Sequence, residues 1–388
     1  MKKIATGLMA VVVGASLLTA CAGGGASGST IKVGIALELS GAVASYGQDT
    51  LTGVQMAADE VNAAGGINGK KIELVKYDTQ SDPAVATTMA TKLTTQDKVI
   101  AIVAPATSGS YKAIVPVANA NKVPIVSGSA TADGATQDAS GAPHPYAFRV
   151  CFSDSFQGTA MATYAKDTLN AKTAVIYGDS SSDYAKGLAA AFEKKFTADG
   201  GTIVDHQAYV AGDTDFSATL TKLKSENFDV IYLPGYYQEV GLIVKTARGL
   251  GMNQPILGGD GYDSPTLLEL GGAQALNNVY FTNHYSSLDQ DPKVLAFIAD
   301  FKSKNGGKDP NGFSAMGFDT LNFIVDSIKR ASAQTGEGVA KAMAATKDFP
   351  AVTGTLSVDP ATHNAIKQLV VIGLKDGQQA SSTKVSVS

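Results

Sequence analysis

Tryptophan is absent from the 388 residues, cysteine occurs twice and histidine four times. The sequence has no basic run, and its formal net charge of −4 argues against nucleic acid as a partner. His144, His206, His284 and His363 lie far apart, and none is followed three or four residues later by another metal-ligand residue. The sequence therefore predicts no nucleic-acid partner, no metal site and no cofactor.

Catalytic signatures are missing as well. The sequence contains no Gly-rich phosphate loop ending in Gly-Lys-Ser or Gly-Lys-Thr, no G-x-S-x-G nucleophile elbow and no H-E-x-x-H motif. We therefore expect a binding protein and not an enzyme. Two alternatives stay open: an exported α/β hydrolase, whose nucleophile and base would come from distant residues, and a purely structural surface protein.

The first 20 residues are typical of a secretory signal peptide. Lys2 and Lys3 give a basic start. The apolar run from Leu8 to Leu18 has the length of a signal-peptide core and is too short to span a bilayer. We expect residues 1–20 to be removed from the mature protein.

The signal segment ends in Leu-Thr-Ala-Cys, which resembles a bacterial lipobox in which Cys21 is acylated. The alternative is an ordinary signal peptide followed by a chance cysteine. Residues 21–30 are rich in Gly, Ala and Ser, a composition typical of a flexible tether. We predict an extracytoplasmic protein that touches a membrane only through this anchor, on the outer face of the cell membrane or the periplasmic side in a Gram-negative cell. Cys151 would be the remaining thiol, which excludes an internal disulfide.

Apolar strands alternate with amphipathic helices from residue 31 onward, and the rhythm restarts after Val150. One helix start is marked by Asp82 as the N-cap and Pro83 as the first helical residue. The alternation predicts an α/β fold with two doubly wound parallel sheets, one in each lobe. The predicted strands are 31–37, 72–77, 99–104, 123–127, 173–177, 202–209, 230–233, 256–257 and 279–285, with 355–358 and 367–374 near the C-terminus.

Two facing sheets define where a ligand should bind. Ligands of open α/β sheets bind beyond the carboxyl ends of the strands, so the lobes predict a cleft that closes around a small solute. We expect a three-stranded hinge, with the chain crossing between lobes near Val150, Tyr280 and Gly354. The predicted first lobe comprises residues 31–149 and 280–353, and the second lobe comprises residues 150–279 and 354–388.

The segment IKVGIALELSGAVASYG, the helix ending in NAAGGINGK and the following KYDTQSDP form a specific pattern. They resemble the start of the branched-chain amino-acid-binding (Leu/Ile/Val-binding) family, which has the type I periplasmic binding protein fold. VPIVSGSATA, DSSSDYAKGL, TDFSATLTKLKSENFDVIYLPGYYQEVG and NGFSAMGFDTL extend the resemblance over about residues 31–373. It implies a monomeric substrate-binding lipoprotein that hands a small amino acid to the permease subunits of an ABC importer.

The resemblance implies that the first lobe holds the α-carboxylate of the ligand. Thr107 and Ser108 match this position at a strand-to-helix turn, where unpaired amides and the helix dipole favour an anion. The alternative is a purely structural role, in which these two residues only cap the helix. Ser129, Ala130 and Thr131 match a second turn that contacts carboxylate and ammonium in the family.

The second lobe is expected to hold the ammonium group. Asp260 matches the family's carboxylate, although the best-known members carry Glu there, which leaves the preferred ligand open. Four aromatic residues match the remaining walls: Tyr46, Tyr184, Tyr236 and Phe313. A tyrosine ring offers flat apolar area for an aliphatic side chain. We expect a branched-chain or other aliphatic amino acid; a short amide, urea or an aromatic acid is the alternative ligand.

Overall fold

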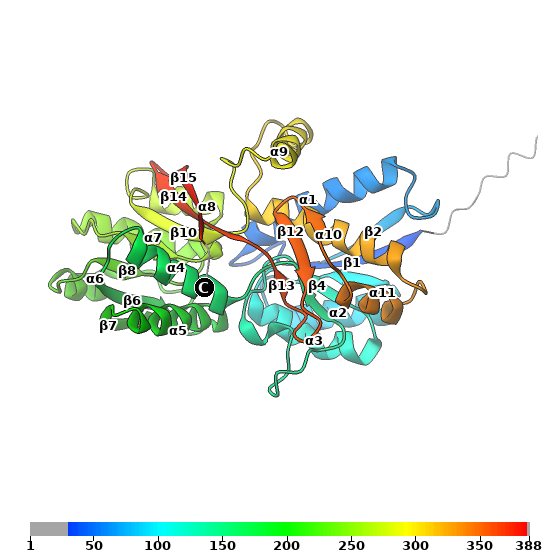
Figure 1. Cartoon of the computed structure of the whole chain (residues 1–388), viewed down its shortest axis with the longest axis horizontal. Helices are drawn as coiled ribbons and strands as arrows, with labels where there is room; N and C mark the ends of the chain where they lie inside the picture. Colours follow the sequence, from blue (N-terminus) through cyan, green and yellow to red (C-terminus); the bar gives the residue numbers. More distant parts are fainter. Residues whose placement is uncertain (1–29, 386–388) are drawn as a thin grey trace, which may run out of the picture.

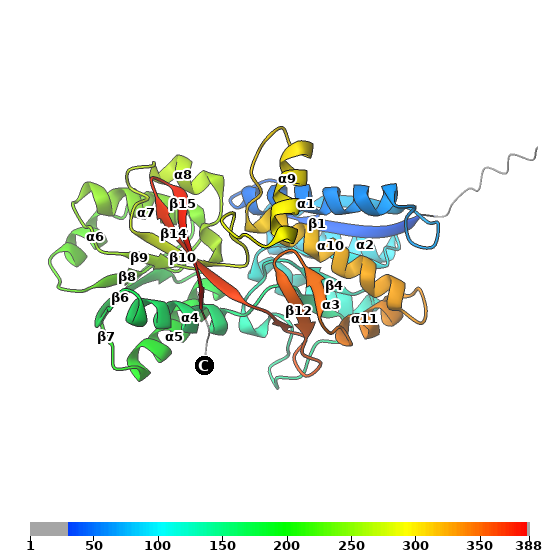
Figure 2. The same ribbon diagram turned by 45° about the horizontal axis from the view of Figure 1, so that its top comes forward.

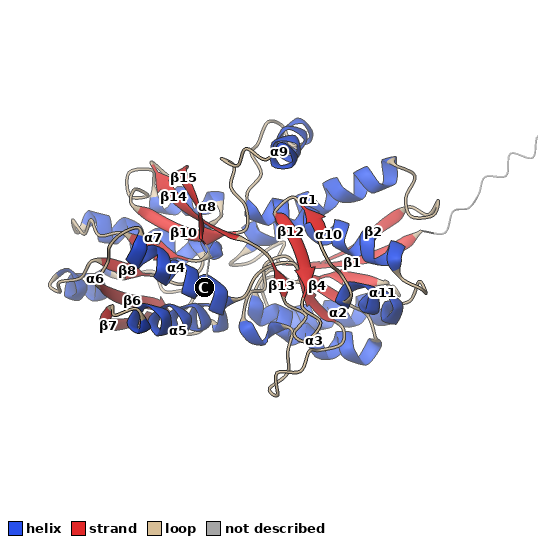
Figure 3. Cartoon of the chain, viewed as in Figure 1, coloured by secondary structure: helices blue, strands red, loops and turns tan. Residues whose placement is uncertain are grey.

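The computed structural model describes residues 30–385, so the predicted signal peptide and Cys21 lie outside the described residues. Two lobes lie side by side, and in each one helices cover both faces of a sheet (Figures 1 and 3). No helix within residues 30–385 combines the length and apolar character needed to cross a membrane. The predicted α/β architecture of two lobes is confirmed.

The first lobe is built on a five-stranded parallel sheet with the order β2-β1-β3-β4-β5. Helix α2 begins where predicted, because the Asp82 side chain accepts hydrogen bonds from the amides of Ala84 and Val85 and Pro83 stands at the first helical position. The strands are β1 (Ile31–Leu37), β2 (Ile72–Asp78), β3 (Ala101–Val103), β4 (Ile125–Ser127) and β5 (Ala147–Arg149). The helices from the first half of the chain are α1 (Ala44–Ala63), α2 (Pro83–Thr95), α3 (Ser108–Asn121) and the short η1 (Asp133–Ala135).

Later residues complete the first lobe. Helix α10 packs along α1, and a small antiparallel sheet, β11-β12-β13, lies against the middle of α10. Leu356 and Val358 of β12 are buried in the same apolar cluster as Val33 of β1. The added elements are α9 (Pro292–Lys304), α10 (Gly312–Arg330), α11 (Gly336–Ala344), β11 (Phe349–Ala351), β12 (Gly354–Val358) and β13 (Ala365–Ile366).

The second lobe contains a seven-stranded sheet with the order β15-β14-β10-β9-β8-β6-β7. Strands β10, β9, β8, β6 and β7 pair in parallel. Strand β14 pairs antiparallel with β10, and β15 pairs antiparallel with β14 at the edge of the sheet. Its strands are β6 (Thr173–Asp179), β7 (Thr202–Tyr209), β8 (Val230–Tyr232), β9 (Ile256–Gly258), β10 (Val279–Asn283), β14 (Leu369–Lys375) and β15 (Gln378–Val385). Its helices are α4 (Asp154–Asp167), α5 (Asp183–Ala198), α6 (Ser217–Lys224), α7 (Tyr237–Gly249), α8 (Pro265–Gly271) and the short η2 (Asp260–Tyr262).

Two of the predicted crossings between lobes need correction. Strand β10 pairs with β9 and β14, so the chain leaves the second lobe after Asn283 and not near Tyr280. Strands β12 and β13 pair with each other beside the first lobe, so the return lies between β13 and β14 and not near Gly354. Figure 2 shows this last segment running from one lobe to the other. Strand patterns alone do not tell which sheet a strand joins, which is why both positions were misplaced.

Candidate ligand-binding site

A small cavity lies between the lobes at the carboxyl ends of their strands. The free space is about 10 Å³, close to what one water molecule needs, so the walls of the cavity lie nearly in contact. The structure therefore brings seven of the ten predicted binding residues together around one closed gap between the lobes. The lining residues are Tyr46, Ala106, Thr107, Ser129, Tyr184, Tyr236, Asp260, Gly261 and Phe313.

Aromatic rings form much of the wall and join the two lobes. Tyr46 of α1 stacks on Phe313 of α10 with ring centroids 4.3 Å apart. Tyr184 and Tyr236 of the second lobe stack at 5.2 Å, and Tyr46 meets Tyr236 edge-on at 5.6 Å across the cleft. Such pairs add to the apolar burial of the rings and provide a rigid surface for an aliphatic group.

Ser108, Ala130 and Thr131 do not line the cavity, although we expected them to contact ligand. The Ser108 hydroxyl accepts a hydrogen bond from the amide of Ala132 at 3.1 Å. The Ala130 carbonyl accepts from the buried Arg149 guanidinium at 3.1 Å, and the Thr131 carbonyl accepts from the Asp154 amide at 2.9 Å. These residues brace the turn that carries Ser129, one layer behind the cavity wall.

Asp260 is the carboxylate that the second lobe contributes to the cavity, and only 3% of it is exposed. Its Oδ1 accepts hydrogen bonds from the Tyr184 hydroxyl at 2.9 Å and from Gln157 Nε2 at 3.2 Å. Its Oδ2 lies 3.2 Å from Nε2 of His284. Burial lowers the pKa of His284 to about 4, so the imidazole is neutral at pH 7 and donates from Nε2. Asp260 is thus held by neutral donors from its own lobe and from the connecting segment that follows β10.

Gln157, which the sequence did not single out, fixes the position of Asp260. Besides the bond to the carboxylate, its Oε1 accepts from the Asp260 amide at 3.2 Å and from the Thr282 hydroxyl at 2.6 Å. Gln157 therefore ties the turn after β9 to the hinge-side strand β10. Gln157 stands 103 residues from Asp260, so no local pattern points to this role.

The predicted role of Thr107 as a carboxylate donor needs correction. Its amide and its hydroxyl both donate to Glu38 Oε1, at 3.0 and 2.8 Å, and the Ala106 amide donates to Glu38 Oε2 at 2.9 Å. An internal carboxylate that the sequence analysis missed therefore takes these donors. The Thr107 oxygen keeps its lone pairs and can accept a hydrogen bond from a ligand.

Ser129 offers the cavity the same kind of atom. Its hydroxyl donates to the Ala106 carbonyl at 3.0 Å, and its amide donates to the Ser127 hydroxyl at 3.2 Å. Thr107 and Ser129 in the first lobe and Asp260 in the second lobe therefore present oxygen acceptors from both sides. This arrangement suits a cationic group. No residue of helix α3 lines the cavity, but its first amides, which follow Thr107, have no intrahelical acceptor, and the positive end of the helix dipole favours an anionic group at this end of the cavity.

Direct contacts across the cleft show that the lobes are closed. Tyr46 donates from its hydroxyl to the Gly261 carbonyl, and Tyr237 donates to the Ala42 carbonyl at 3.2 Å. On the other side of the cavity, the Lys112 ammonium of α3 pairs with Asp183 of α5 at 3.0 Å. Closure therefore brings polar groups of the two lobes into hydrogen-bond distance around the cavity.

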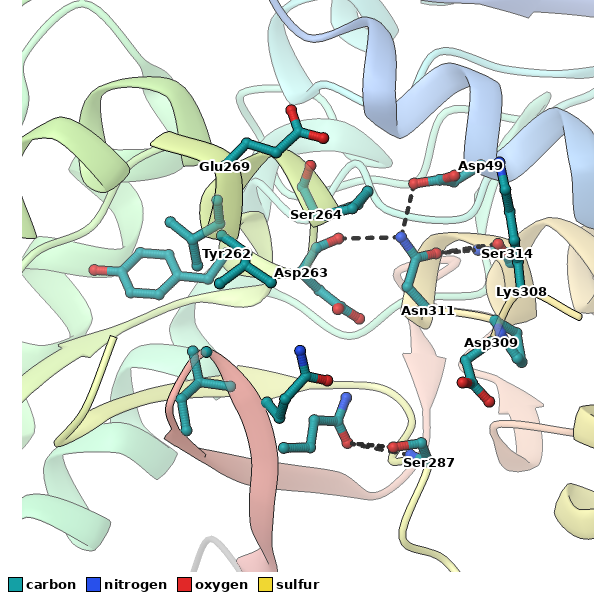
Figure 4. Close-up of a pocket in the computed structure, with 18 of the residues that line it drawn as sticks. Asp49, Tyr262, Asp263, Ser264, Glu269, Ser287, Lys308, Asp309, Asn311 and Ser314 are labelled. Atoms are coloured by element: carbon teal, nitrogen blue, oxygen red, sulfur yellow. Dashed lines mark hydrogen bonds between the residues drawn. The ribbon is translucent and has the colours of Figure 1, made fainter. Parts of the chain in front are cut away.

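A wider groove beside the cavity is also crossed by interlobe hydrogen bonds (Figure 4). The Asn311 amide side chain, at the start of α10, donates to the Asp263 carbonyl at 3.4 Å across the groove and to Asp49 Oδ2 at 2.7 Å within the first lobe. The Gly312 amide donates to Asp263 Oδ2 at 2.6 Å, and Asn283 donates to the same atom at 2.7 Å. Asp263 belongs to the second lobe and α10 to the first, so this carboxylate links the lobes in the closed form.

Two hinged lobes with a small polar and aromatic cavity between them define the class of solute-binding proteins. The model of the family described as periplasmic binding protein matches residues 30–379. The chain therefore belongs to the periplasmic binding protein family, whose members bind solutes and are not enzymes. This assignment also places the protein outside the cytoplasm, and the expected type I fold is confirmed.

Relatives with named ligands agree with the expected family. A Leu/Ile/Val-binding protein of Rhizobium johnstonii is 32% identical over 328 residues, which cover 84% of this chain and 87% of the relative. The branched-chain amino acid transporter substrate-binding protein LivJ of Streptococcus pneumoniae, solved with isoleucine, is 41% identical, with a TM-score of 0.87 over 92% of this chain and 99% of that one. A solute-binding protein of R. palustris solved with benzoate is 24% identical, with a TM-score of 0.81 over 92% of this chain and 96% of that one, and shows the fold alone.

Proposed function

We propose that the protein captures a small aliphatic amino acid between its lobes and delivers it to the permease subunits of an ABC importer. The observation that carries this proposal is the buried Asp260 carboxylate at the cavity, facing the acceptor oxygens of Thr107 and Ser129 from the other lobe. An ammonium group satisfies acceptors on both sides at once and compensates the buried charge.

The rest of the ligand follows from this position of the ammonium group. Its carboxylate points toward the first amides of α3, where the helix N-terminus favours an anion. Its aliphatic side chain lies among the rings of Tyr46, Tyr236 and Phe313. Closing the lobes buries the ligand, and the closed form is the shape that an importer recognises.

The N-terminal residues support a lipid anchor for this solute-binding protein. We infer that Cys21 is acylated after removal of residues 1–20 and that residues 21–30 tether a monomeric two-lobed body to the membrane. Mass spectrometry of the mature N-terminus tests this anchor: the proposal requires a diacylglyceryl group on Cys21, and an unmodified Cys21 contradicts it.

A thermal-shift screen of the twenty amino acids, with benzoate, urea and acetamide added, tests the proposed ligand. A ligand at 100 times its dissociation constant adds about 2.7 kcal/mol to the free energy of unfolding. We expect the largest rise in Tm with leucine, isoleucine, valine or another aliphatic amino acid. A rise with benzoate or urea and none with any amino acid would reject the proposal and favour the alternative ligands.

A further inference from the structure

Glu38 places a second carboxylate beside the ligand cavity, in the lobe opposite Asp260. It follows strand β1 directly and is fully buried. Its hydrogen-bond donors are the amides of Ala106 and Thr107 and the Thr107 hydroxyl, at 2.8 to 3.0 Å. These are the donors that a ligand carboxylate would otherwise meet at this turn.

The fold holds Glu38 in this position. Strand β1 pairs in parallel with β3, so the carboxyl ends of the two strands meet and Glu38 faces the turn that follows β3. The backbone around Glu38 is also confined by α1, since a Cβ on Gly47 would lie 2.1 Å from the Glu38 carbonyl oxygen. The side chain therefore cannot withdraw from the turn with its backbone, and the three hydrogen bonds are a fixed part of the first-lobe wall.

Only one residue, Thr107, separates the Glu38 carboxylate from the cavity. Thr107, which lines the cavity, is in direct contact with Glu38. The charge of Glu38 is also one of the causes, after burial, that raise the pKa of Tyr236 on the far side of the cavity. The cavity is thus flanked by two buried carboxylates, Glu38 from the first lobe and Asp260 from the second.

We propose that Glu38 is a specificity-determining residue that makes the site reject carboxylic acids lacking an ammonium group. The proposal rests on the proposed function, in which a zwitterion places its ammonium group between the two carboxylates. An acid without that group adds a third negative charge to a desolvated site and brings no cation to compensate it. The buried charge of Glu38 therefore lowers the affinity for the acid more than the affinity for the zwitterion, and this difference is the specificity.

The test compares L-leucine with 4-methylpentanoic acid, which has the same side chain and carboxylate but no ammonium group, by isothermal titration calorimetry on the mature protein. Wild type is expected to bind leucine and to bind the acid at least a hundredfold more weakly. Glu38→Ala frees the three donors and removes one charge, so the ratio of the two Kd values should fall at least tenfold. Glu38→Gln removes the charge and keeps the shape of the side chain, so a smaller fall in the Kd ratio is expected. This variant serves as the test if Glu38→Ala does not fold.

Glu239→Ala is the matched control, because Glu239 is also a buried glutamate that accepts from a backbone amide, that of Gly212, away from the cavity. An unchanged Kd ratio in the Glu38 variants, or an equal fall in the Glu239 variant, overturns the role of Glu38. If wild type binds no leucine, the proposed function fails instead. The acid arm still tests Glu38 in that case, because only loss of its side chain should create acid binding.

Discussion

The two walls of the cavity each contain a buried carboxylate, and each carboxylate is held by neutral donors. Glu38 in the first lobe is bonded to Ala106 and Thr107 and stands behind the wall. Asp260 in the second lobe is bonded to Gln157, Tyr184 and His284, yet it lines the cavity itself. Each carboxylate has three such contacts, so the two differ in their position relative to the cavity and not in the number of their hydrogen bonds.

Removing Asp260 should have the largest effect on ligand binding. Truncating one partner of a buried charge pair typically costs about 2–5 kcal/mol, so Asp260→Ala should weaken amino-acid binding at least about tenfold. Asp309→Ala is the control, because this exposed aspartate pairs with Lys302 away from the cavity. If calorimetry gives the same Kd for both variants, Asp260 does not hold the ammonium group of the ligand.

If His284 is neutral in the folded protein, the free energy of unfolding should depend on pH in the acid range. Its pKa is lowered to about 4 in the folded protein, mainly by burial, against about 6.5 for an unperturbed histidine. The unfolded chain therefore binds more protons, and the free energy of unfolding should fall between pH 6.5 and 4, by up to about 3 kcal/mol. This loss should shrink in His284→Gln and stay in His206→Gln, where the histidine is exposed. Urea unfolding at several pH values measures it; equal slopes in both variants would mean that His284 does not contribute.

A methyl group at Gly312 should separate the lobes without touching either carboxylate of the cavity. A Cβ there would lie 2.6 Å from Asn283 Oδ1 and 2.7 Å from Asp263 Oδ2, both in the second lobe and tied to each other by a hydrogen bond. Overpacking of this kind costs about 1–3 kcal/mol, so Gly312→Ala should weaken ligand binding about tenfold. Small-angle scattering should also show a larger radius of gyration with ligand present.

Gly249→Ala is the control for Gly312→Ala, because a Cβ on this helical glycine of α7 meets no atom within 4 Å. Both variants should keep their melting temperature without ligand, since in the open form the second lobe withdraws from α10. Equal ligand affinity in the two variants would show that the contact at Gly312 has no part in closure.

The smallest effect is expected at the rim of the cleft. The pKa of Asp183 is lowered by its hydrogen bonds from Lys112 and Lys186, but the Lys112 and Asp183 side chains are 37% and 50% exposed. Exposed ion pairs contribute about 0–1 kcal/mol. Lys112→Ala should therefore raise the Kd less than about fivefold at low salt and have no effect at 0.5 M salt. A salt-independent change of tenfold or more would place Lys112 in the binding site itself.

Much of the fold could be predicted because hydrophobic periodicity reflects burial. Strands β1 (Ile31–Leu37) and β7 (Thr202–Tyr209) have the predicted bounds. Strand β15 was missed because its sequence, QQASSTKV, is polar and largely exposed at a sheet edge. Helix α8 was missed because its seven residues are too few for a periodic pattern. The crossings were misplaced because they depend on strand pairing between distant residues.

Tyr46, Tyr184 and Asp260 of the cavity wall were predicted from the family resemblance. The residues that orient the wall could not be predicted in this way. Glu38 acts through Thr107, 69 residues later, and Gln157 acts through Asp260, 103 residues later. Such pairs leave no local signal, because their hydrogen bonds exist only after the strands have assembled.

The measurement that tests the central claim most directly is a calorimetric titration of the wild-type protein with three matched molecules. L-leucine carries both charges, 4-methylpentanoic acid carries only the carboxylate, and 3-methylbutylamine carries only the ammonium group. If a zwitterion is held between α3 and Asp260, leucine should bind at least a hundredfold more tightly than either of the other two. Binding of the acid as tightly as leucine would contradict the account, because Asp260 would then have no cation to hold.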